Sequence, residues 1–360
     1  MRMLNLLFVT IPLIFDRKVH SISSEYVSLT SGYNNTWRAR NMNKVCIRAS
    51  SISKDNVLEK SLNNESNSEW DIHVTSPAKI NIFLRILRKR EDGFHELASL
   101  FQAISLSDRL SLRSQSELAK DSMECNMPGV PTDSSNLILK ALDVFRKNTG
   151  TKEFFHVRLE KNVPMEAGLG GGSANAASAL WAINELSGRP ATNAQLAEYG
   201  AEFGSDISFF FSNGTAYCTG RGEIMEEVES LPSLELYVVK PNVGMSTGAV
   251  FRAMDYNELS KTDPKKILNE VLSGNLSRAD LVNDLEKPSF KLMPSLMELK
   301  KKLIEFGFDV VLMSGSGSSF YCIGVPNCVT WMTDLDSVSP GIFIQKARFI
   351  NRNPDQWYST

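Results

Sequence analysis

The 360-residue chain lacks several features that mark common protein classes. It has five cysteines and no CxxC pair, so the sequence indicates neither a disulfide framework nor a zinc site. Its formal net charge is −2, so no broad basic field suggests nucleic-acid binding. Neither a bilayer-length apolar run nor an internal repeat is present. The composition is that of a soluble globular protein, long enough for one large domain or two ordinary ones.

Two familiar phosphate-binding motifs are also missing. The chain contains no G-x-x-x-x-G-K-[ST], which excludes an ordinary P-loop. Its one glycine-dense stretch, "GLGGGS" at 168–173, misses the G-x-G-x-x-G spacing because Ser173 stands where the third glycine belongs. A dehydrogenase with a nicotinamide-binding Rossmann domain is therefore a weak interpretation.

The first ~70 residues differ in composition from the rest of the chain. They open with "MRMLNLLFVTIPLIF", and residues 1–53 hold seven Lys or Arg against two acidic residues, in a Ser- and Asn-rich context. An apolar start followed by a basic, acid-poor tract predicts a bipartite leader that directs the chain to a plastid. A disordered extension or a wrongly assigned start codon is the alternative. We therefore assign residues 1–69 to a leader and polar linker.

The first part of the remaining chain mixes strand and helix signals. Residues 71–74 and 80–87 are expected as two strands separated by Pro77, and 98–113 and 154–164 as further strands. A helix is expected over 133–150, capped by Asp133 or Ser134 and closed by Gly150.

Further helices are expected from about Ser173 to Gly188 and over 193–204, the latter capped by Thr192 or Asn193. Residues 207–228 read as strands joined by an Asn-Gly turn. The second half adds an amphipathic helix near 295–307 and strands at 308–314 and 320–324. Without a regular βαβ repeat, we expect an α+β protein with two lobes, 70–235 and 236–360.

The stretch "PMEAGLGGGSANAA" at 164–177 carries the first chemical signal. Its glycines leave backbone N–H groups unshielded, and the helix that follows adds unpaired N–H groups and the positive end of its dipole. Together these make an anion site suited to phosphate. A plain glycine-rich turn before a small-residue packing helix is the alternative.

Four further features have both a chemical and a structural interpretation. Lys79 and Asn81 lie two apart, so on a strand they share one face, although Lys79 alone could be an edge cation. Phe94 and His95 offer an aromatic face and a two-sided hydrogen-bonding ring, or a turn packed on the core. Asp206 stands at a Gly-Ser break and could equally cap a helix. The loop "SGSGSS" at 314–319 could close over phosphates, pack on the first loop, or form a flexible hairpin.

Taken in order, "PAKIN", "AGLGGGSANAA" and "SGSGSSF" resemble the three motifs of the GHMP kinase superfamily. Residues ~71–358 are similar to the plant form of the member that phosphorylates a cytidyl-linked methylerythritol in non-mevalonate isoprenoid synthesis. The resemblance implies a two-lobed α+β kinase with ATP as phosphoryl donor, Mg²⁺, and a small-molecule acceptor phosphorylated at its 2-hydroxyl. It implies no protein metal ligands, no nucleic-acid partner and no membrane contact in the mature form.

The resemblance also implies roles for individual residues. Lys79 and Asp206 would be the catalytic pair, and Asn81, Phe94, His95 and Phe251 would bind the acceptor, with His95 reading cytosine between the two phenyl rings. The loop expected to hold the ATP phosphates comprises Pro164, Ala167, Gly168, Leu169, Gly170, Gly171, Gly172 and Ser173. The third-motif loop comprises Gly315, Ser316 and Gly317.

Three residues depart from the family pattern: Glu166, Ala174 and Ser208 replace the usual Gly, Ser and Pro. Glu166 would weaken nucleotide binding unless its carboxylate points away from the loop. Two rival functions remain at this point. A related kinase could act on mevalonate, homoserine or a sugar, but these acceptors carry no nucleobase that would stack on Phe94 and Phe251. A non-catalytic nucleotide sensor would have no need of Lys79 and Asp206.

Overall fold

The computed structural model describes residues 69–115, 120–276 and 279–359. Apart from Glu69, the leader predicted for residues 1–69 lies outside these ranges. The strands are β1 (Ile72–Lys89), β2 (His95–Ser114), β3 (Ser122–Cys125), β4 (Phe155–Glu160), β5 (Thr215–Thr219), β6 (Ile224–Glu227), β7 (Glu235–Lys240), β8 (Val310–Met313), β9 (Phe320–Ile323) and β10 (Phe343–Arg348). The α-helices are α1 (Leu137–Thr149), α2 (Gly171–Leu186), α3 (Asn193–Ala201), α4 (Thr247–Arg252), α5 (Pro264–Leu272), α6 (Glu286–Leu292), α7 (Pro294–Glu305) and α8 (Trp331–Val338).

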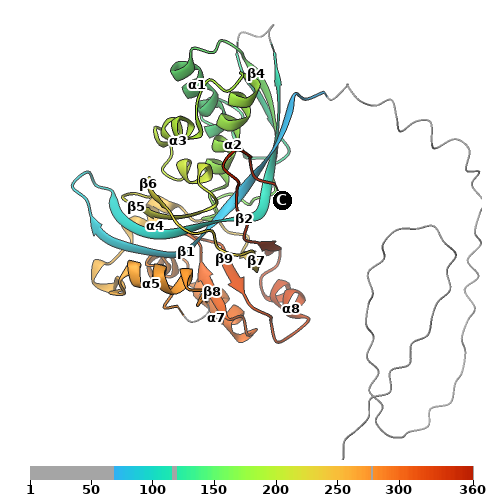
Figure 1. The fold of residues 1–360 in the computed structure, drawn as a ribbon. Helices are drawn as coiled ribbons and strands as arrows, with labels where there is room; N and C mark the ends of the chain where they lie inside the picture. Colours follow the sequence, from blue (N-terminus) through green and yellow to red (C-terminus); the bar gives the residue numbers. More distant parts are fainter. Residues whose placement is uncertain (1–68, 116–119, 277–278, 360) are drawn as a thin grey trace, which may run out of the picture. The chain divides into compact units, whose positions relative to one another are not determined.

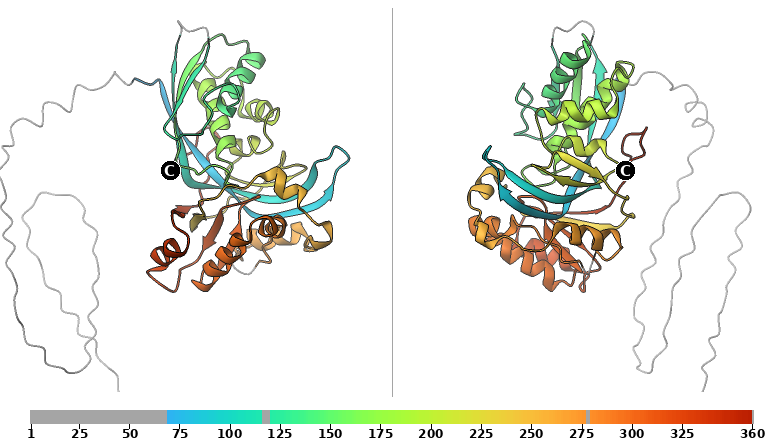
Figure 2. Two further views of the ribbon diagram at one scale, coloured as in Figure 1. Left: turned by 180° about the vertical axis from the view of Figure 1, so that it is seen from behind. Right: turned by 60° about the vertical axis from the view of Figure 1, so that its left-hand side comes forward.

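The long antiparallel hairpin β1–β2 runs through both lobes (Figure 1). Its base belongs to the first lobe, where β2 also pairs with β4 and the order of the sheet is β3-β4-β2-β5-β6. Helices α1, α2 and α3 cover one face of this lobe, as both views of Figure 2 show. Their apolar sides and the sheet form one core cluster that includes Phe145, Leu180 and Phe209.

The second lobe is a four-stranded sheet of order β10-β7-β9-β8 between two apolar layers. Because side chains alternate along a strand, Leu236 and Val238 of β7 pack toward the β1–β2 hairpin with Ile80 and Ile104. Val239 faces the opposite way, into a cluster that holds the buried residues of α7 and α8. The mixed, two-lobed α+β architecture expected from the sequence is confirmed.

Pro77 does not separate two strands, as expected, but lies inside the continuous strand β1. The register shifts beside it, because Pro77 pairs with Ser107 while Ala78 pairs with Ile104. A proline lacks the N–H that a regular ladder needs, and a bulge removes that need without ending the strand. Two further register shifts follow along the same hairpin, between Asn81 and Phe83 and between Ile86 and Arg88.

Residues 207–228 also differ from the expected pair of strands. Ser208–Phe211 form a 3-10 helix, and the hairpin β5–β6 turns at Gly220 and Gly222, both with positive φ, rather than at Asn-Gly. A short apolar run such as "SFFF" does not distinguish a strand from a buried helical turn. In this case all three phenylalanines are buried in the first-lobe core.

Helix ends follow the expected chemistry with small corrections. Gly150 closes α1 in the left-handed region, and Thr192 caps α3 in a full capping box with Gln195, as predicted. The cap of α1 is Asn136 rather than Asp133 or Ser134; Asp133 instead accepts from Ser135 in the preceding turn. Helix α3 ends at Ala201, before Gly204.

The C-terminal segment after β10 returns to the first lobe (Figure 1). Ile350, Trp357 and Tyr358 belong to that lobe's core cluster. The indole of Trp357 stacks on Trp181 of α2 at 5.4 Å and donates to the carbonyl of Thr75 at 2.8 Å. The first lobe is therefore completed by residues from the end of the chain, a feature that the proposed division at 235/236 does not describe.

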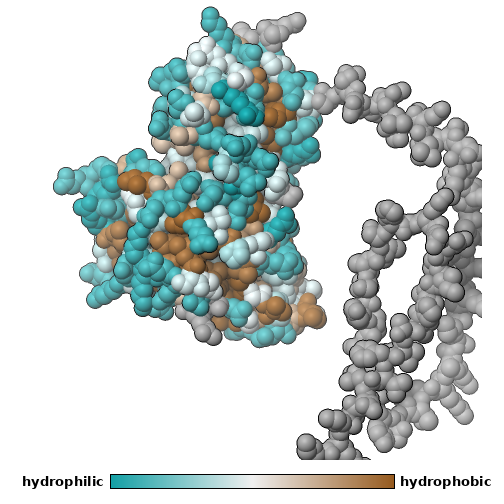
Figure 3. Space-filling view, in the orientation of Figure 1, coloured by the Kyte–Doolittle hydropathy of each residue, from teal (hydrophilic) through white to brown (hydrophobic). Residues whose placement is uncertain are grey.

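Apolar side chains on the surface are mostly scattered. Figure 3 shows a face of mixed hydropathy on which hydrophobic residues lie in several separate places. Val329 and Met332, at the start of α8, are among the exposed apolar residues. Isolated exposed apolar residues are normal on soluble proteins. Within the described ranges, no helix combines the length and the apolarity that crossing a membrane requires.

Candidate active site

A cleft of about 1100 Å³ brings the predicted site residues together. With the exception of Gly317, every site residue predicted from the sequence lines it. Ligand pockets for a single small molecule measure roughly 300–1,000 Å³. The cleft is therefore large enough for a nucleotide together with an acceptor.

Lys79 and Asp206 meet in this cleft although they lie far apart in the chain. The Lys79 Nζ is 3.1 Å from Asp206 Oδ2 and donates to Asn81 Oδ1 at 2.9 Å, as expected if Lys79 and Asn81 share a face of β1. The Lys79 side chain is 5% exposed and that of Asp206 31%. The ammonium is thus enclosed, while part of the carboxylate stays open to the cleft.

Asn81 is held more firmly than the sequence suggested. Its side-chain oxygen accepts from Lys79, and its Nδ2 donates to Ser99 Oγ at 2.8 Å. The Lys79 ammonium also lies 4.3 Å from the centroid of the Phe101 ring, within cation–π range. The ammonium thus has contacts with Asn81, Asp206 and Phe101.

The glycine loop leads directly into helix α2, which begins at Gly171, two residues earlier than expected. Gly170 is its N-cap with φ 66°, and among the described residues no side chain caps this end. The first internal bond runs from Ala174 N to Gly170 O, so the preceding amides remain available. Because glycine has a low helix propensity, the sequence predicted a later start for α2. In the structure these glycines begin the helix, and they leave its first amides open to an anion.

Two glycines of this loop are required by close contacts. A Cβ on Gly170 would lie 2.9 Å from Lys79 Cγ, and one on Gly168 only 2.0 Å from the Ser314 carbonyl oxygen. The loop therefore packs directly on the stem of Lys79 and on the third-motif loop. Both glycines also have positive φ, which other residues rarely adopt.

The third-motif loop packs on the glycine loop rather than forming a free hairpin. Ser314 Oγ donates to Gly168 O at 2.9 Å, and Ser319 N donates to Ala167 O at 3.2 Å. Gly315 and Ser316 line the cleft, whereas Gly317 lies behind them against Met313. Gly317 is thus the one residue of the third-motif loop prediction that does not line the cleft.

Glu166, the departure that could repel a nucleotide, has its carboxylate over the backbone of Gly244. A Cβ on Gly244 would lie 2.0 Å from Glu166 Oε2. Pro164 lines the cleft, and the buried side chains of Ala167 and Leu169 anchor the loop in the core beneath it. The Glu166 carboxylate is therefore directed toward the second lobe.

Lys161 is a cleft residue that the sequence analysis missed. Its Nζ lies close to Gly171, 3.0 Å from where a Cβ would stand, and pairs with the buried Asp108. Asp108 Oδ1 also accepts from the amides of Asn162 and Val163, at 2.8 and 2.7 Å. A lysine directly after a strand does not by itself indicate a binding site. The position of Lys161 beside the start of α2 is seen only in the folded structure.

The opposite end of the cleft is aromatic. The His95 ring stacks on Phe251 with centroids 4.7 Å apart, and its Nε2 lies 2.7 Å from the hydroxyl of Tyr256. Phe94 is 54% exposed, and the guanidinium of Arg221 lies 4.8 Å from its ring centroid. Desolvation and the charge of Lys89 lower the pKa of His95, so its ring is neutral at pH 7.

Comparison with known families supports this geometry. Residues 136–214 match the GHMP kinases N terminal domain, and residues 265–327 match the GHMP kinases C terminal region. The fold and the cleft thus define a small-molecule kinase of the GHMP class.

Individual relatives narrow the class. The chain is 48% identical over 292 residues to the chloroplastic 4-diphosphocytidyl-2-C-methyl-D-erythritol kinase of Oryza sativa subsp. japonica, covering 80% of this chain and 73% of the relative. It is 44% identical over 294 residues to the kinase of the same name from Protochlamydia amoebophila, covering 82% and 95%. The crystal structure of a 4-(cytidine 5'-diphospho)-2C-methyl-D-erythritol kinase aligns with a TM-score of 0.65 and 29% identity, covering 77% of this chain and 99% of that one. The chain belongs to the 4-diphosphocytidyl-2-C-methyl-D-erythritol kinase family.

Proposed function

We propose that the protein transfers the γ-phosphoryl group of ATP to the 2-hydroxyl of 4-diphosphocytidyl-2-C-methyl-D-erythritol, a step of non-mevalonate isoprenoid synthesis. The observation that carries the proposal is the Lys79–Asp206 contact of 3.1 Å in a cleft with an open helix N-terminus at one end and an aromatic pocket at the other. The identity of 44–48% to kinases of this name supports the same reaction. The chloroplastic relative supports action in a plastid.

The triphosphate is bound at the start of α2. Amide N–H groups of Gly171, Gly172 and Ser173 and the positive end of the helix dipole favour an anion there. The Lys161 ammonium, which pairs with Asp108, lies beside the same turn and gives the anion a further donor. Pro164, Ala167 and the glycines from 168 to 170 shape the loop, and Gly315 and Ser316 border it.

Asp206 and Lys79 act on the acceptor hydroxyl and the transferring phosphoryl group. Phosphoryl transfer passes through a loose transition state, so positioning and charge stabilisation dominate. Because a carboxylate is a weak base toward an alcohol, the proton passes to Asp206 late, once the new P–O bond is forming. Lys79 orients Asp206 and neutralises charge on the moving group. Asn81 holds the ammonium at 2.9 Å.

Magnesium fits this site as a partner of the nucleotide. Among the described residues no group of three or more His, Cys, Asp and Glu side chains could hold a metal ion alone. Mg²⁺ usually takes one or two protein ligands together with phosphate oxygens and water. The partly open Asp206 carboxylate and the Ser173 hydroxyl are the groups that would contact it. When bound, the ion would neutralise charge on the β- and γ-phosphates.

The proposed reaction is tested by ADP release from the full chain with ATP and each of several acceptors. We expect release with the cytidyl substrate and a product phosphorylated at the 2-hydroxyl, identified by ³¹P NMR. Mevalonate and homoserine serve as control acceptors, because neither carries a nucleobase. Release with either of them and none with the cytidyl compound would contradict the proposed acceptor, and no release with any acceptor would contradict kinase activity.

His95 and the two phenyl rings bind the cytosine end. Replacing His95 by alanine should raise the KM for the cytidyl substrate about 10-fold, since a hydrogen bond and a ring contact are lost. The KM for ATP should change less than twofold. Steady-state kinetics with each substrate varied in turn gives both values. His156→Ala, a half-buried histidine outside the cleft, is the matched control, and equal effects of His95→Ala on both KM values would refute the assignment.

Acid should weaken binding of the cytidyl substrate specifically. Because the pKa of His95 is lowered by desolvation and by Lys89, the ring is neutral at pH 7 and gains its proton only below the ordinary value of about 6.5. Protonation removes the acceptor at Nε2, which lies 2.7 Å from the Tyr256 hydroxyl, and adds a charge beside the base. The KM for the cytidyl substrate should therefore rise as pH falls below about 6.5. In His95→Gln the same pH series should show a smaller rise; an unchanged rise would assign the effect to another group.

A further inference from the structure

Tyr256 contacts the ring of His95 from a loop that no motif of the sequence singles out. Its hydroxyl is 2.7 Å from His95 Nε2, and the two rings are nearly parallel, 17° apart with centroids at 6.1 Å. Among the described residues this is the sole hydrogen bond of the His95 ring. The other ring nitrogen, Nδ1, is therefore the one left for a ligand.

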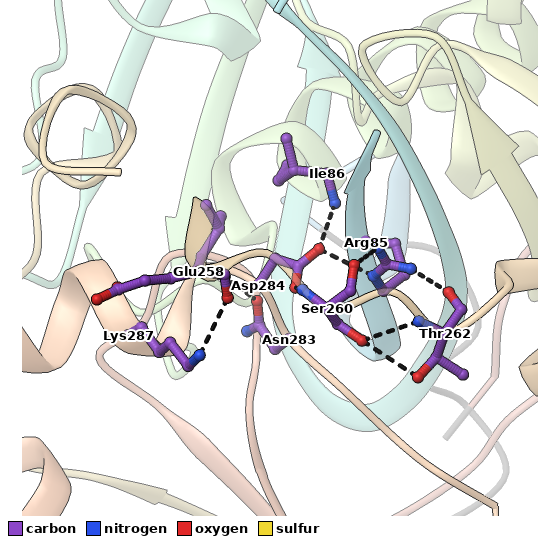
Figure 4. A network of polar contacts seen from close by, with 9 residues as sticks. Arg85, Ile86, Glu258, Ser260, Thr262, Asn283, Asp284 and Lys287 are labelled. Atoms are coloured by element: carbon purple, nitrogen blue, oxygen red, sulfur yellow. Dashed lines mark hydrogen bonds and ion pairs between the residues drawn. The ribbon is translucent and has the colours of Figure 1, made fainter. Parts of the chain in front are cut away.

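The loop that carries Tyr256 is held in place by a buried ion pair (Figure 4). Asp284 Oδ2 accepts from Arg85 Nε at 2.9 Å and from Ile86 N at 2.8 Å, while its Oδ1 accepts from Ser260 N at 2.9 Å. The Arg85 guanidinium donates further to the carbonyls of Ser260 and Thr262. Arg85 is 5% exposed and Asp284 8%.

The near end of the loop is also fixed. Asp255 Oδ1 accepts from Asn257 N at 2.9 Å and caps the 3-10 turn Tyr256–Glu258. Lys287 Nζ donates to the carbonyl of Glu258 at 3.0 Å (Figure 4). The backbone that follows Tyr256 is therefore tied to α6 through Glu258 and to β1 through Ser260, although Tyr256 itself is 43% exposed. A rigid platform of this kind can impose one orientation on its partner ring.

The hydroxyl determines what His95 offers to a base. A neutral imidazole carries one N–H and one acceptor nitrogen. When Tyr256 donates to Nε2, the proton of His95 resides on Nδ1, which then is a donor. Cytosine presents acceptors at O2 and N3, whereas uracil carries N–H at position 3. A donor at Nδ1 therefore fits cytosine and opposes uracil at that position.

We propose that Tyr256 is a positioning residue that holds His95 as its Nδ1–H tautomer and so selects cytidyl over uridyl ligands in the cleft. This inference rests on the proposed function, because it takes His95 as the residue that reads the base. It also changes the expectation that His95 uses both ring nitrogens on cytosine, since the Tyr256 hydroxyl occupies one of them.

Binding of CDP and of UDP to the full chain, measured by titration calorimetry, tests the selection. We expect the wild-type protein to prefer CDP and Tyr256→Phe, which loses only the hydroxyl, to lower that preference about 3- to 10-fold. Affinity for a non-hydrolysable ATP analogue should stay the same. Tyr199→Phe on α3 is the matched control. In the His95→Ala background, Tyr256→Phe should have no further effect; an unchanged CDP preference in Tyr256→Phe overturns the proposal.

The tautomer is read directly from the ¹⁵N shifts of the His95 ring in the ligand-free protein. We expect a protonated Nδ1 in the wild-type protein and a shift toward protonated Nε2 in Tyr256→Phe. A wild-type ring protonated at Nε2 would overturn the inference. Neither the spectra nor CDP binding requires turnover, so a failure of the proposed kinase reaction would be seen separately, in the ADP-release assay.

Discussion

Replacing Asp206 by asparagine should lower kcat about 100-fold or more, because the amide keeps the shape of the carboxylate but cannot accept the acceptor's proton. The substitution also removes the charge partner of Lys79, 3.1 Å away. The KM for ATP should change little, since we propose that the amides at the start of α2, not Asp206, bind the triphosphate. Initial rates of ADP release with saturating substrates measure the effect.

Lys79→Met is the companion variant. The methionine retains an apolar stem against Gly170 and Phe101, so a loss of turnover reports the missing ammonium rather than a collapsed loop. We expect a reduction of similar size, about 100-fold. Glu198→Gln, which removes an exposed carboxylate from α3, should leave turnover within twofold. Near-normal kcat in Asp206→Asn or in Lys79→Met would disprove the role assigned to that residue.

Replacing Asp284 by asparagine should destabilise the protein by about 3–5 kcal/mol, because it leaves the buried guanidinium of Arg85 without a counter-charge. The two carboxylate oxygens accept three hydrogen bonds, from Arg85, Ile86 and Ser260. In asparagine one of these oxygens is replaced by an NH2 group, which donates and cannot accept, so at least one of the three bonds is lost. The free energy of unfolding from urea titrations measures the loss.

Glu298→Gln is the control for this prediction. Glu298 pairs with Lys301 at 3.0 Å on the surface, where both side chains are more than half exposed, and such pairs contribute only about 0–1 kcal/mol. The double variant Arg85→Met with Asp284→Leu removes both charges and should lose less stability than Asp284→Asn. Equal stability of Asp284→Asn and Glu298→Gln would show that the ion pair does not hold the second lobe's loop.

Local signals were sufficient wherever neighbouring residues decide the structure. The amphipathic helix near 295–307 and the left-handed cap at Gly150 follow from the residues of those segments alone. The glycine loop could be predicted to precede a helix start, because the bare backbone and the first helical residues are adjacent in sequence. The resemblance to a known family supplied the pairing of Lys79 with Asp206, which are 127 positions apart.

Features that depend on distant partners could not be predicted. The bulge at Pro77 depends on the register of β2, and the position of Lys161 depends on Asp108 from another strand. Tyr256 carries no signal because its loop is held near His95 by contacts with distant parts of the chain, among them those of Ser260 with Arg85 and Asp284. In each case the contact that determines the structure joins residues far apart in the sequence, and neither periodicity nor composition indicates such a contact.

The return of the C-terminal segment to the first lobe has a consequence for biogenesis. Trp357 fills a place between Trp181 and the carbonyl of Thr75, so this core remains open until residue 357 is available. Domains made on the ribosome commonly fold from the N-terminus onward. Here the first lobe must wait, during translation or passage through an organelle's import pore, for residue 357 to emerge.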